Sequence, residues 1–521
     1  MKRRDFLKNS VIVSSGLALG TSVNASAAEA GSIGLNQKRS IGEYNRLNIP
    51  PQIYRPFRKT YSLPTLYIQD SLHEFYPGRQ SYAVSLSTLF HRCSYLGPTI
   101  RVKNGDLVEF SIANLRSEPV TNHWHGMHIP GAIDGGPHQM IQPGETWRFR
   151  MAVNQEAATN WYHDHTCEKT AEQVYFGHAG MFIIEDDNSE MLGLPNTYGV
   201  NDIPLILQDK LFDSAWEQQY YIEAGPVFWG DYIIANGTFN PYCRVAPGLI
   251  RFRVLNAGNN RQFGLHFRDG REFYVIAGDG GFLNNPVLVN KATVYPGERM
   301  EMVVDFSGDR GAVLDLLAET ITANPADGLV DMQVMRILVN AGYPLFARVP
   351  SVLRREPIDW ESAVANAPAA SRSFRMSANE DSTEMYINDQ AYDMHVVNES
   401  VPIGVPEVWE VSATGDHPFH VHGCSFLILD IDGKPPEMEL RGWKDTVVLP
   451  LPDGNTNGRF FKAHILVEFN HPTYRYPDIE SEAAVFNRDL DYHIPYMYHC
   501  HRLEHEDKGM MGQFTVYHET Q

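Results

Sequence analysis

The stretch that most restricts how this chain can fold lies near its C-terminus, at residues 498–505, and reads Tyr-His-Cys-His-Arg-Leu-Glu-His. One thiolate, two imidazoles and a weak axial thioether are the ligands of a blue-copper site. Cys500 supplies the thiolate, His505 one imidazole, and Met510, a little further on, the axial contact. The second imidazole must come from a distant segment, and His417 is the best candidate.

The two histidines that flank Cys500 indicate a strand with a different site on each face. Successive side chains of an extended segment point to opposite faces, so His499 and His501 face away from Cys500. Metals on the two faces would then lie on the order of 10 Å apart, linked through a few covalent bonds. The alternative is a buried free cysteine beside surface histidines.

Three further His-x-His pairs offer partners for a metal cluster. With 21 histidines in 521 residues, chance gives only about 0.8 such pairs, so a single pair is weak evidence and four are strong. On a strand such a pair points both imidazoles to one face, which suits a shared cluster. The four pairs are His123/His125, His163/His165, His420/His422 and His499/His501.

Four stretches resemble, in order, the copper signatures of multicopper oxidases. They are His123-Trp124-His125-Gly126, His163-Asp164-His165, His417-Pro418-Phe419-His420-Val421-His422 and His499-Cys500-His501. The resemblance covers nearly the whole chain after its leader and is strongest to bacterial laccases and periplasmic copper-efflux oxidases. Bilirubin oxidase is a more distant relative.

The resemblance implies four copper ions, of which one is type 1, one is type 2 and two form a type 3 pair. The implied ligands are His417, Cys500, His505 and axial Met510 for type 1, His123 and His420 for type 2, and His125, His163, His165, His422, His499 and His501 for type 3. It also implies that Asp134 and Glu506 are catalytic groups that assist proton delivery. The alternative for Asp134 is a turn residue before two glycines.

Internal repeats indicate three copies of one fold. Residues 110–114 resemble residues 252–256, and residues 409–413 alternate similarly; Pro-Gly-Glu at 143–145 returns at 296–298. These recurrences lie about 150 residues apart, which is one domain. With the family resemblance, they predict an all-β chain of three cupredoxin-like, Greek-key β-sandwich domains.

The N-terminus has the order of features of a twin-arginine signal peptide. Arg3 and Arg4 precede a short apolar run at 11–19 and the small residues 25–27. The predicted segments are a signal peptide at 1–27, an N-terminal arm at 28–60, domain 1 at 61–187, domain 2 at 200–342, a connection at 343–375 and domain 3 at 376–521. Domain 2 is expected to be a spacer without copper, and the chain to be periplasmic or secreted through the twin-arginine (Tat) export machinery.

Charge and length exclude some partners. The formal net charge of −20 argues against nucleic acid and anionic membranes. No apolar stretch reaches the 18 or so residues that a membrane span needs. Besides Cys500, the cysteines at positions 93, 167, 243 and 424 allow three complete disulfide pairings, which the sequence leaves open.

The expected function is a laccase-type oxidase that couples one-electron oxidation of phenols or aromatic amines to four-electron reduction of dioxygen to water. A cuprous oxidase serving copper tolerance, with Cu(I) as reductant, is the alternative; a non-catalytic copper-binding or electron-carrier protein is a third possibility. Only Met376, Met385 and Met394 lie between residue 343 and His417, where copper-efflux oxidases carry a methionine-rich insertion. A long insertion at 472–493 precedes the Cys500 strand.

Overall fold

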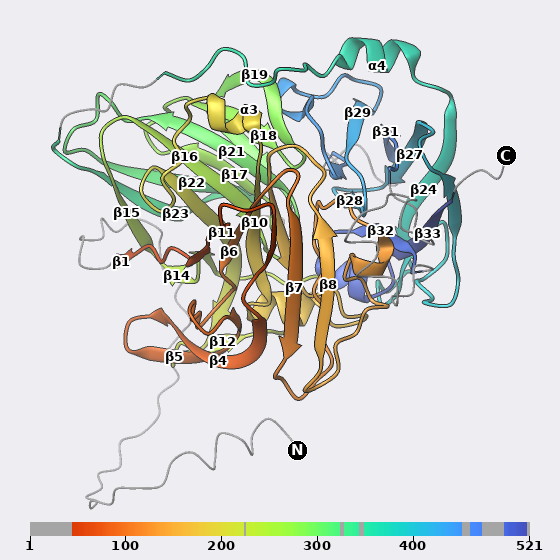
Figure 1. Cartoon of the computed structure of the whole chain (residues 1–521), viewed down its shortest axis with the longest axis horizontal. Coiled ribbons are helices and arrows are strands. Elements are labelled where there is room, and N and C mark those ends of the chain that lie inside the picture. The colour runs from red at the N-terminus through yellow and green to blue at the C-terminus, as the bar shows by residue number, and fades with distance from the viewer. Residues whose placement is uncertain are drawn as a thin grey trace, which may run out of the picture. The chain divides into compact units, whose positions relative to one another are not determined.

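The computed structural model describes residues 44–222, 226–322, 328–342, 348–450, 459–470 and 494–517. Its regular structure is mostly strand, arranged in six sheets that pack pairwise into three β-sandwiches (Figure 1). The predicted all-β class is therefore confirmed. No helix of the described part is long and apolar enough to cross a membrane. The predicted signal peptide and the 472–493 insertion lie outside the described residues.

The first sandwich pairs a sheet ordered β3-β7-β4-β5, with β8 on β7, and a sheet ordered β2-β6-β10-β9. Alternate side chains of the two sheets meet in one core, as Phe110 and Ile112 do with Ile100 and Val102. The strands are β2 (Gln52–Ile53), β3 (Thr60–Ser62), β4 (Leu66–Tyr76), β5 (Arg79–Ser87), β6 (Thr99–Lys103), β7 (Leu107–Asn114), β8 (Thr146–Ala152), β9 (Ala158–His163) and β10 (Ala179–Glu185).

The second sandwich pairs sheets ordered β1-β15-β23-β22-β17-β20 and β14-β13-β11-β16-β21-β18-β19, with β12 on β11. Its strands are β1 (Asn45–Arg46), β11 (Asp202–Phe212), β12 (Gln218–Gln219), β13 (Tyr232–Ala235), β14 (Thr238–Phe239), β15 (Pro241–Val245), β16 (Leu249–Asn256), β17 (Phe263–Phe267), β18 (Phe273–Gly278), β19 (Gly281–Val289), β20 (Lys291–Val294), β21 (Arg299–Asp305), β22 (Val313–Ile321) and β23 (Leu329–Val339).

The third sandwich pairs sheets ordered β25-β24-β27-β31-β29 and β26-β33-β32-β28-β30. Its strands are β24 (Ala370–Ala378), β25 (Met385–Ile387), β26 (Glu399–Pro402), β27 (Glu407–Ala413), β28 (Pro418–Val421), β29 (Phe426–Ile431), β30 (Thr446–Val448), β31 (Phe461–Val467), β32 (Tyr496–Cys500) and β33 (Met511–Tyr517). The helices are short: η2 (Gly131–Ile133), α2 (Thr170–Phe176), α3 (Asp187–Met191), α4 (Trp360–Asn366), η4 (Met438–Leu440) and α6 (Leu503–Asp507).

The described part of the predicted arm is joined to two sandwiches rather than loosely packed. Strand β1 pairs in parallel with β15 of the second sandwich, and the buried β2 pairs in parallel with β6 of the first. Both strands are only two residues long, too short for an alternating pattern to show in the sequence. The domain limits drawn from the sequence stay predictions.

Candidate metal centre

Strand β32 carries the His-Cys-His triplet and pairs antiparallel with β28. Phe419 lies opposite Cys500, and His420 lies opposite His499. Residues opposite one another in an antiparallel pair share a face, so His420 and His499 lie on one face and Cys500 on the other. Cys500 is fully buried in the core of the third sandwich. The alternation expected from the sequence is therefore present.

On the Cys500 face, three side chains converge. The distances are 3.4 Å from His417 Nδ1 to Cys500 Sγ, 3.7 Å from Cys500 Sγ to His505 Nδ1, and 3.3 Å between the two Nδ1 atoms. His505 lies on α6, which follows β32 directly, and His417 immediately precedes β28. Met510 is buried in the same core, and its carbonyl accepts a hydrogen bond of 3.0 Å from the Cys500 amide.

The donors of this Cys500 site fit a soft metal ion. Burial raises the pKa of the Cys500 thiol to about 12, so the thiol loses its proton only when a cation takes its place. Burial lowers the pKa of His417 to about 3, which keeps its ring neutral and its lone pair available.

Beside the Cys500 site, a carboxylate is paired rather than free. Asp416 is 6% exposed and lies 2.6 Å from Arg502 Nη2, beside the half-buried His417. Arg502, which forms this ion pair, lies two residues after Cys500.

On the opposite face, the eight remaining histidines of the four motifs form one buried cluster, which we call the eight-histidine cluster. Four come from the first sandwich and four from the third. His499 Nε2 lies 3.3 Å from His165 Nε2 and 3.2 Å from His422 Nε2. Every one of the eight is at most 1% exposed.

Unpartnered ring nitrogens show that the eight-histidine cluster fits metal ions. A buried polar atom without a hydrogen-bond partner is costly, and a bound metal removes that cost. Such atoms are the Nε2 atoms of His123, His163, His420 and His501, and Nδ1 of His125. Burial first, and neighbouring imidazoles second, lower the pKa of His163, His422 and His501 well below the usual range. Neutral imidazoles whose nitrogens lie within 4.8 Å of one another in groups of three suit bound copper.

Known proteins resemble this arrangement. Residues 87–189 match a family model described as multicopper oxidase, and residues 366–466 and 477–520 match another with the same description. The multicopper oxidase mco of Staphylococcus haemolyticus is 34% identical over 458 residues, which cover 87% of this chain and 88% of that protein. This chain belongs to the multicopper oxidase family.

Two other relatives of this chain have different descriptions. The cell division protein FtsP of Xenorhabdus nematophila is 36% identical over 439 residues, covering 81% of this chain and 83% of that protein. The solved structure of a laccase-like multicopper oxidase, CueO of Ochrobactrum sp., is 33% identical, with a TM-score of 0.73, and covers 90% of this chain and all of its own. That enzyme is described as having oxidase activity towards lignin model compounds and lignosulfonate.

Three buried carboxylates surround the eight-histidine cluster of this multicopper oxidase. Each contacts one histidine of the first sandwich and one of the third, at 2.7–3.6 Å: Asp134 with His123 and His422, Glu506 with His165 and His499, and Asp445 with His125 and His420. A carboxylate that holds one ring nitrogen fixes the ring and leaves the other nitrogen for a metal. Asp134 and Glu506 are thus placed beside the cluster, as expected from the sequence.

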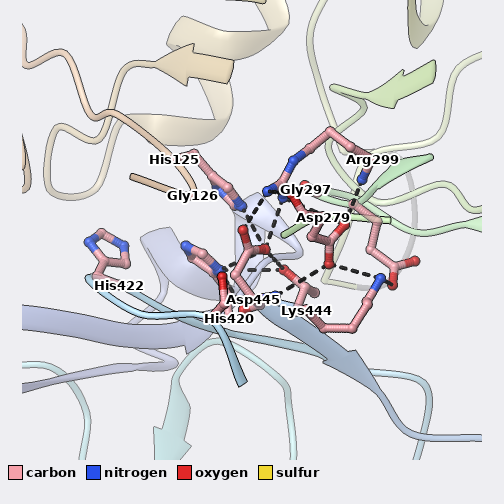
Figure 2. A network of polar contacts seen from close by, with 12 residues as sticks. His125, Gly126, Asp279, Gly297, Arg299, His420, His422, Lys444 and Asp445 are labelled. Carbon is pink, nitrogen blue, oxygen red and sulfur yellow. Dashed lines mark hydrogen bonds and ion pairs between the residues drawn. The ribbon is translucent and has the colours of Figure 1, made fainter. Parts of the chain in front are cut away.

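Two residues of this site were not singled out by the sequence. Asp445 immediately precedes β30 and lies in none of the four histidine motifs. Arg299, in the second sandwich, forms a bidentate ion pair with Asp445 (Figure 2). Although burial acts to raise the pKa of Asp445, Arg299 holds it well below the usual range. A lone arginine at the start of a strand leaves no sequence signal for such a contact.

The five cysteines of this multicopper oxidase are all unpaired in the structure. Cys93, Cys167, Cys243 and Cys424 therefore form no disulfide here. Cys424 is buried and lies two residues after His422, yet the residue groups that could hold a metal in the described structure do not include it.

Proposed function

We propose that this multicopper oxidase is a laccase-type enzyme that takes single electrons from phenols or aromatic amines and passes four of them to dioxygen, forming two water molecules. The observation that carries the proposal is the position of Cys500 on β32, between His499 and His501 of the eight-histidine cluster. One strand thus joins a site suited to accept electrons to a cluster suited to hold oxygen.

The proposed ligands follow the two faces of β32. His417, Cys500, His505 and Met510 would hold type 1 copper, His123 and His420 would hold type 2, and His125, His163, His165, His422, His499 and His501 would hold the type 3 pair. Bound copper supplies the one-electron redox chemistry, with the thiolate and imidazoles suited to that metal. The protein contributes the burial that excludes water and the carboxylates that orient the rings.

Proton delivery is assigned to Asp134 and Glu506. Reduction of one dioxygen to two waters consumes four protons, and these two carboxylates are 2–3% exposed and contact cluster histidines. Burial acts to raise the pKa of Glu506, but His165 and His499 hold it below the usual range. Glu506 therefore stays ionised beside these histidines and can hold a relayed proton only transiently before passing it on.

Phenols are favoured over Cu(I) because two of the three methionines between residue 343 and His417 are buried and the third, Met394, is half-buried. Soft sulfur ligands are what Cu(I) prefers. Of the three methionines ahead of His417, Met376 is 1% and Met385 2% exposed, both in the core of the third sandwich. The oxidase activity towards lignin model compounds that is described for the Ochrobactrum relative supports an organic reductant for this chain. The alternative, a cuprous oxidase in copper tolerance, requires Cu(I) to be the better reductant.

The second candidate is a role in cell division like the one named for FtsP, which the 36% identity favours. Oxygen uptake distinguishes the candidates. Copper-loaded protein is expected to consume oxygen with phenols and aromatic amines, with a higher kcat/KM than with Cu(I). Cys500→Ser is expected to lose both the blue absorbance and this uptake while it stays folded, because the thiolate is the source of the colour. A colourless wild type without uptake would contradict the oxidase proposal.

Export is part of the proposal. The twin arginines at positions 3 and 4, the apolar run and the small residues at 25–27 support passage through the twin-arginine route to the periplasm or the outside. Replacing both arginines with lysine is expected to leave the precursor in the cytoplasm, measured by cell fractionation. Unimpaired export of that variant would indicate the general secretory route.

A further inference from the structure

The turn before β21 of the second sandwich lies against the eight-histidine cluster, although the second sandwich supplies none of its histidines. Gly297 in this turn has a φ of +86°, and a Cβ atom added there would lie 2.7–2.9 Å from the His501 ring. Only glycine combines that backbone conformation with so close an approach. The second sandwich is thus in contact with the cluster and does more than separate its neighbours.

Arg299, two residues further on, joins all three sandwiches. Its side chain is fully buried, and its Nη1 and Nη2 donate to the two carboxylate oxygens of Asp445 at 2.9 and 2.5 Å. Its Nε donates to the Thr159 carbonyl at 3.0 Å, and Nη2 also donates to Asn160 Oδ1 at 3.2 Å, both on β9 of the first sandwich. The planar guanidinium matches this set of acceptors in a way that lysine cannot.

Asp445 transfers this constraint to two histidines, one from each ligand-bearing sandwich. Its Oδ1 lies 3.3 Å from His125 Nε2, and its carbonyl lies 2.8 Å from His420 Nδ1. The nitrogens that remain, His125 Nδ1 and His420 Nε2, have no hydrogen-bond partner. The two rings stack with centroids 3.8 Å apart at 10°. The contacts to Asp445 therefore decide which nitrogen each ring offers to a metal.

A second ion-pair layer holds the same elements together. Lys444 Nζ lies 2.8 Å from Asp279 and 2.7 Å from Glu298, and Asp279 accepts the Arg299 backbone amide at 2.8 Å. Figure 2 shows these groups converging on Asp445 from the second and third sandwiches. Buried charges that are paired on every side keep a defined geometry, because any displacement leaves a charge unpaired.

We propose that Arg299 is a positioning residue for the eight-histidine cluster, and that the second sandwich acts on copper binding through it. The bidentate contact fixes the Asp445 carboxylate, whose Oδ1 lies 3.3 Å from His125 Nε2 and 3.6 Å from His420 Nδ1, and it thereby also holds in place the Asp445 backbone carbonyl that contacts His420 at 2.8 Å. The role rests on the proposed copper sites and concerns the cluster edge nearest His420, the proposed type 2 ligand. The Cys500 site, on the other face of β32, is independent of Arg299.

The test compares copper retention in Arg299→Lys and Arg299→Met with that in Arg251→Met. Arg251 lies in the same sandwich, and its buried guanidinium binds Glu301, with Nε at 2.8 Å, and lies 4.0 Å from Asp202. Copper per chain is measured after loading, with the type 2 electron paramagnetic resonance signal, the blue absorbance and thermal unfolding. Loss of copper to a chelator is followed over time.

Both Arg299 variants are expected to lose type 2 copper about tenfold faster than the wild type, the scale of effect seen for groups that orient metal ligands. Their blue absorbance per chain is expected to stay unchanged. Arg251→Met is expected to unfold at lower temperature with its copper count intact. Arg299→Lys keeps a cation beside Asp445 and so provides a folded variant if Arg299→Met does not fold.

If the Arg299 variants retained copper and gave a type 2 signal as the wild type does, the positioning role would be overturned. Equal copper loss in Arg251→Met would overturn it too, because the effect would then come from general destabilisation. Copper-loaded wild type without oxygen uptake would refute the oxidase proposal alone. A wild type that takes up no copper would refute both.

Discussion

Asp164 and Cys500 occupy matching places in two copies of the same motif, Tyr-His-Asp-His and Tyr-His-Cys-His. Asp164 is fully buried and accepts hydrogen bonds from the Thr121 amide at 3.1 Å and the Thr166 amide at 2.8 Å. The Asp164 carboxylate thus accepts hydrogen bonds from backbone amides of the first sandwich, whereas the Cys500 thiol of the third sandwich faces two imidazoles. This difference explains why the first sandwich can supply cluster histidines without a blue site of its own.

Replacing Asp164 with asparagine is expected to change stability in a pH-dependent way. Burial, partly offset by the Thr166 and Thr121 hydrogen bonds, raises the pKa of Asp164 from 3.8 to about 6. The folded state therefore holds this proton more tightly than the unfolded state, and the benefit present below pH 4 is lost as pH rises through about 6. The loss is on the order of 3 kcal/mol.

Asparagine does not titrate, so the stability of Asp164→Asn relative to the wild type should increase as the pH rises from 4 to 7. Urea unfolding of copper-free protein at both pH values measures the gain. A difference in unfolding free energy that stays constant with pH would contradict the raised pKa.

Met510 allows a test of the axial position with a matched neighbour. Met510 is fully buried beside Cys500, and Met511, next along the chain, is 4% exposed at the start of β33. Met510→Leu is expected to keep the blue colour and raise the reduction potential, because a weak donor that favours Cu(II) is removed. Met511→Leu is expected to leave the potential unchanged in a redox titration. A lower potential in Met510→Leu would count against the axial assignment.

Among the elements, α6 connects the cluster to the first sandwich through consecutive carboxylates. Glu506 contacts His165 and His499, and Asp507 accepts the backbone amides of Thr170 and Ala171 at the start of α2, each at 2.9 Å. These amides have no partner within their own helix, so Asp507 serves as their cap from another sandwich. The short α6 thereby holds the first and third sandwiches together at the interface where the eight-histidine cluster lies.

Asp507→Asn is expected to destabilise the protein by about 1–3 kcal/mol, because the side-chain amide nitrogen would face one of the two backbone donors and leave it unpaired. Denaturant unfolding and hydrogen exchange at the Thr170 and Ala171 amides measure the effect. Glu172→Gln, on the same helix α2, is the control and should leave exchange at these two amides unchanged. Unaltered protection in Asp507→Asn would refute the capping role.

Local sequence patterns predicted where strands and turns lie better than which strands pair with one another. The alternation around Cys500 indicated a strand with two different faces, and β32 has them. The Asn-Gly sequence at positions 104–105 is typical of a turn, and Gly105 has a φ of +84°, but this turn carries the chain from β6 in one sheet to β7 in the other. A turn signal shows where the chain reverses, whereas the choice of neighbouring strand depends on packing that local sequence does not encode.

At the scale of the whole molecule, the histidine motifs placed the cluster between the first and third sandwiches, and the structure brings them together there. What the sequence missed was the contribution of the second sandwich. Arg299 and Asp445 are 146 residues apart, and a single ion pair between distant segments has no periodicity or motif spacing. The histidines that the structure brings together were predictable because metal chemistry dictates residue type, whereas Arg299 and Asp445 were not.

Net charge is the remaining property of the whole molecule with a measurable consequence. The chain carries 63 acidic and 43 basic residues, so its field attracts cations. Beside His417, however, Asp416 is paired with Arg502, which leaves little local preference for either sign. Selectivity for charged reductants should therefore come from the long-range field, which salt screens: the Debye length falls from about 30 Å at 0.01 M to about 8 Å at 0.15 M.

A phenol that bears a trimethylammonium group and the same phenol with a neutral tert-butyl group form a matched pair for this test. Between about 0.01 and 0.15 M salt, kcat/KM for the cationic phenol is expected to fall several-fold, while that for the neutral phenol stays constant. Oxygen uptake by fully loaded enzyme measures both, in a salt whose anion does not bind copper. If the two phenols respond alike, the acidic surface serves solubility and does not guide substrate. If the cationic phenol reacts faster at high salt, Arg502 dominates the approach, and Arg502→Gln should then remove the effect.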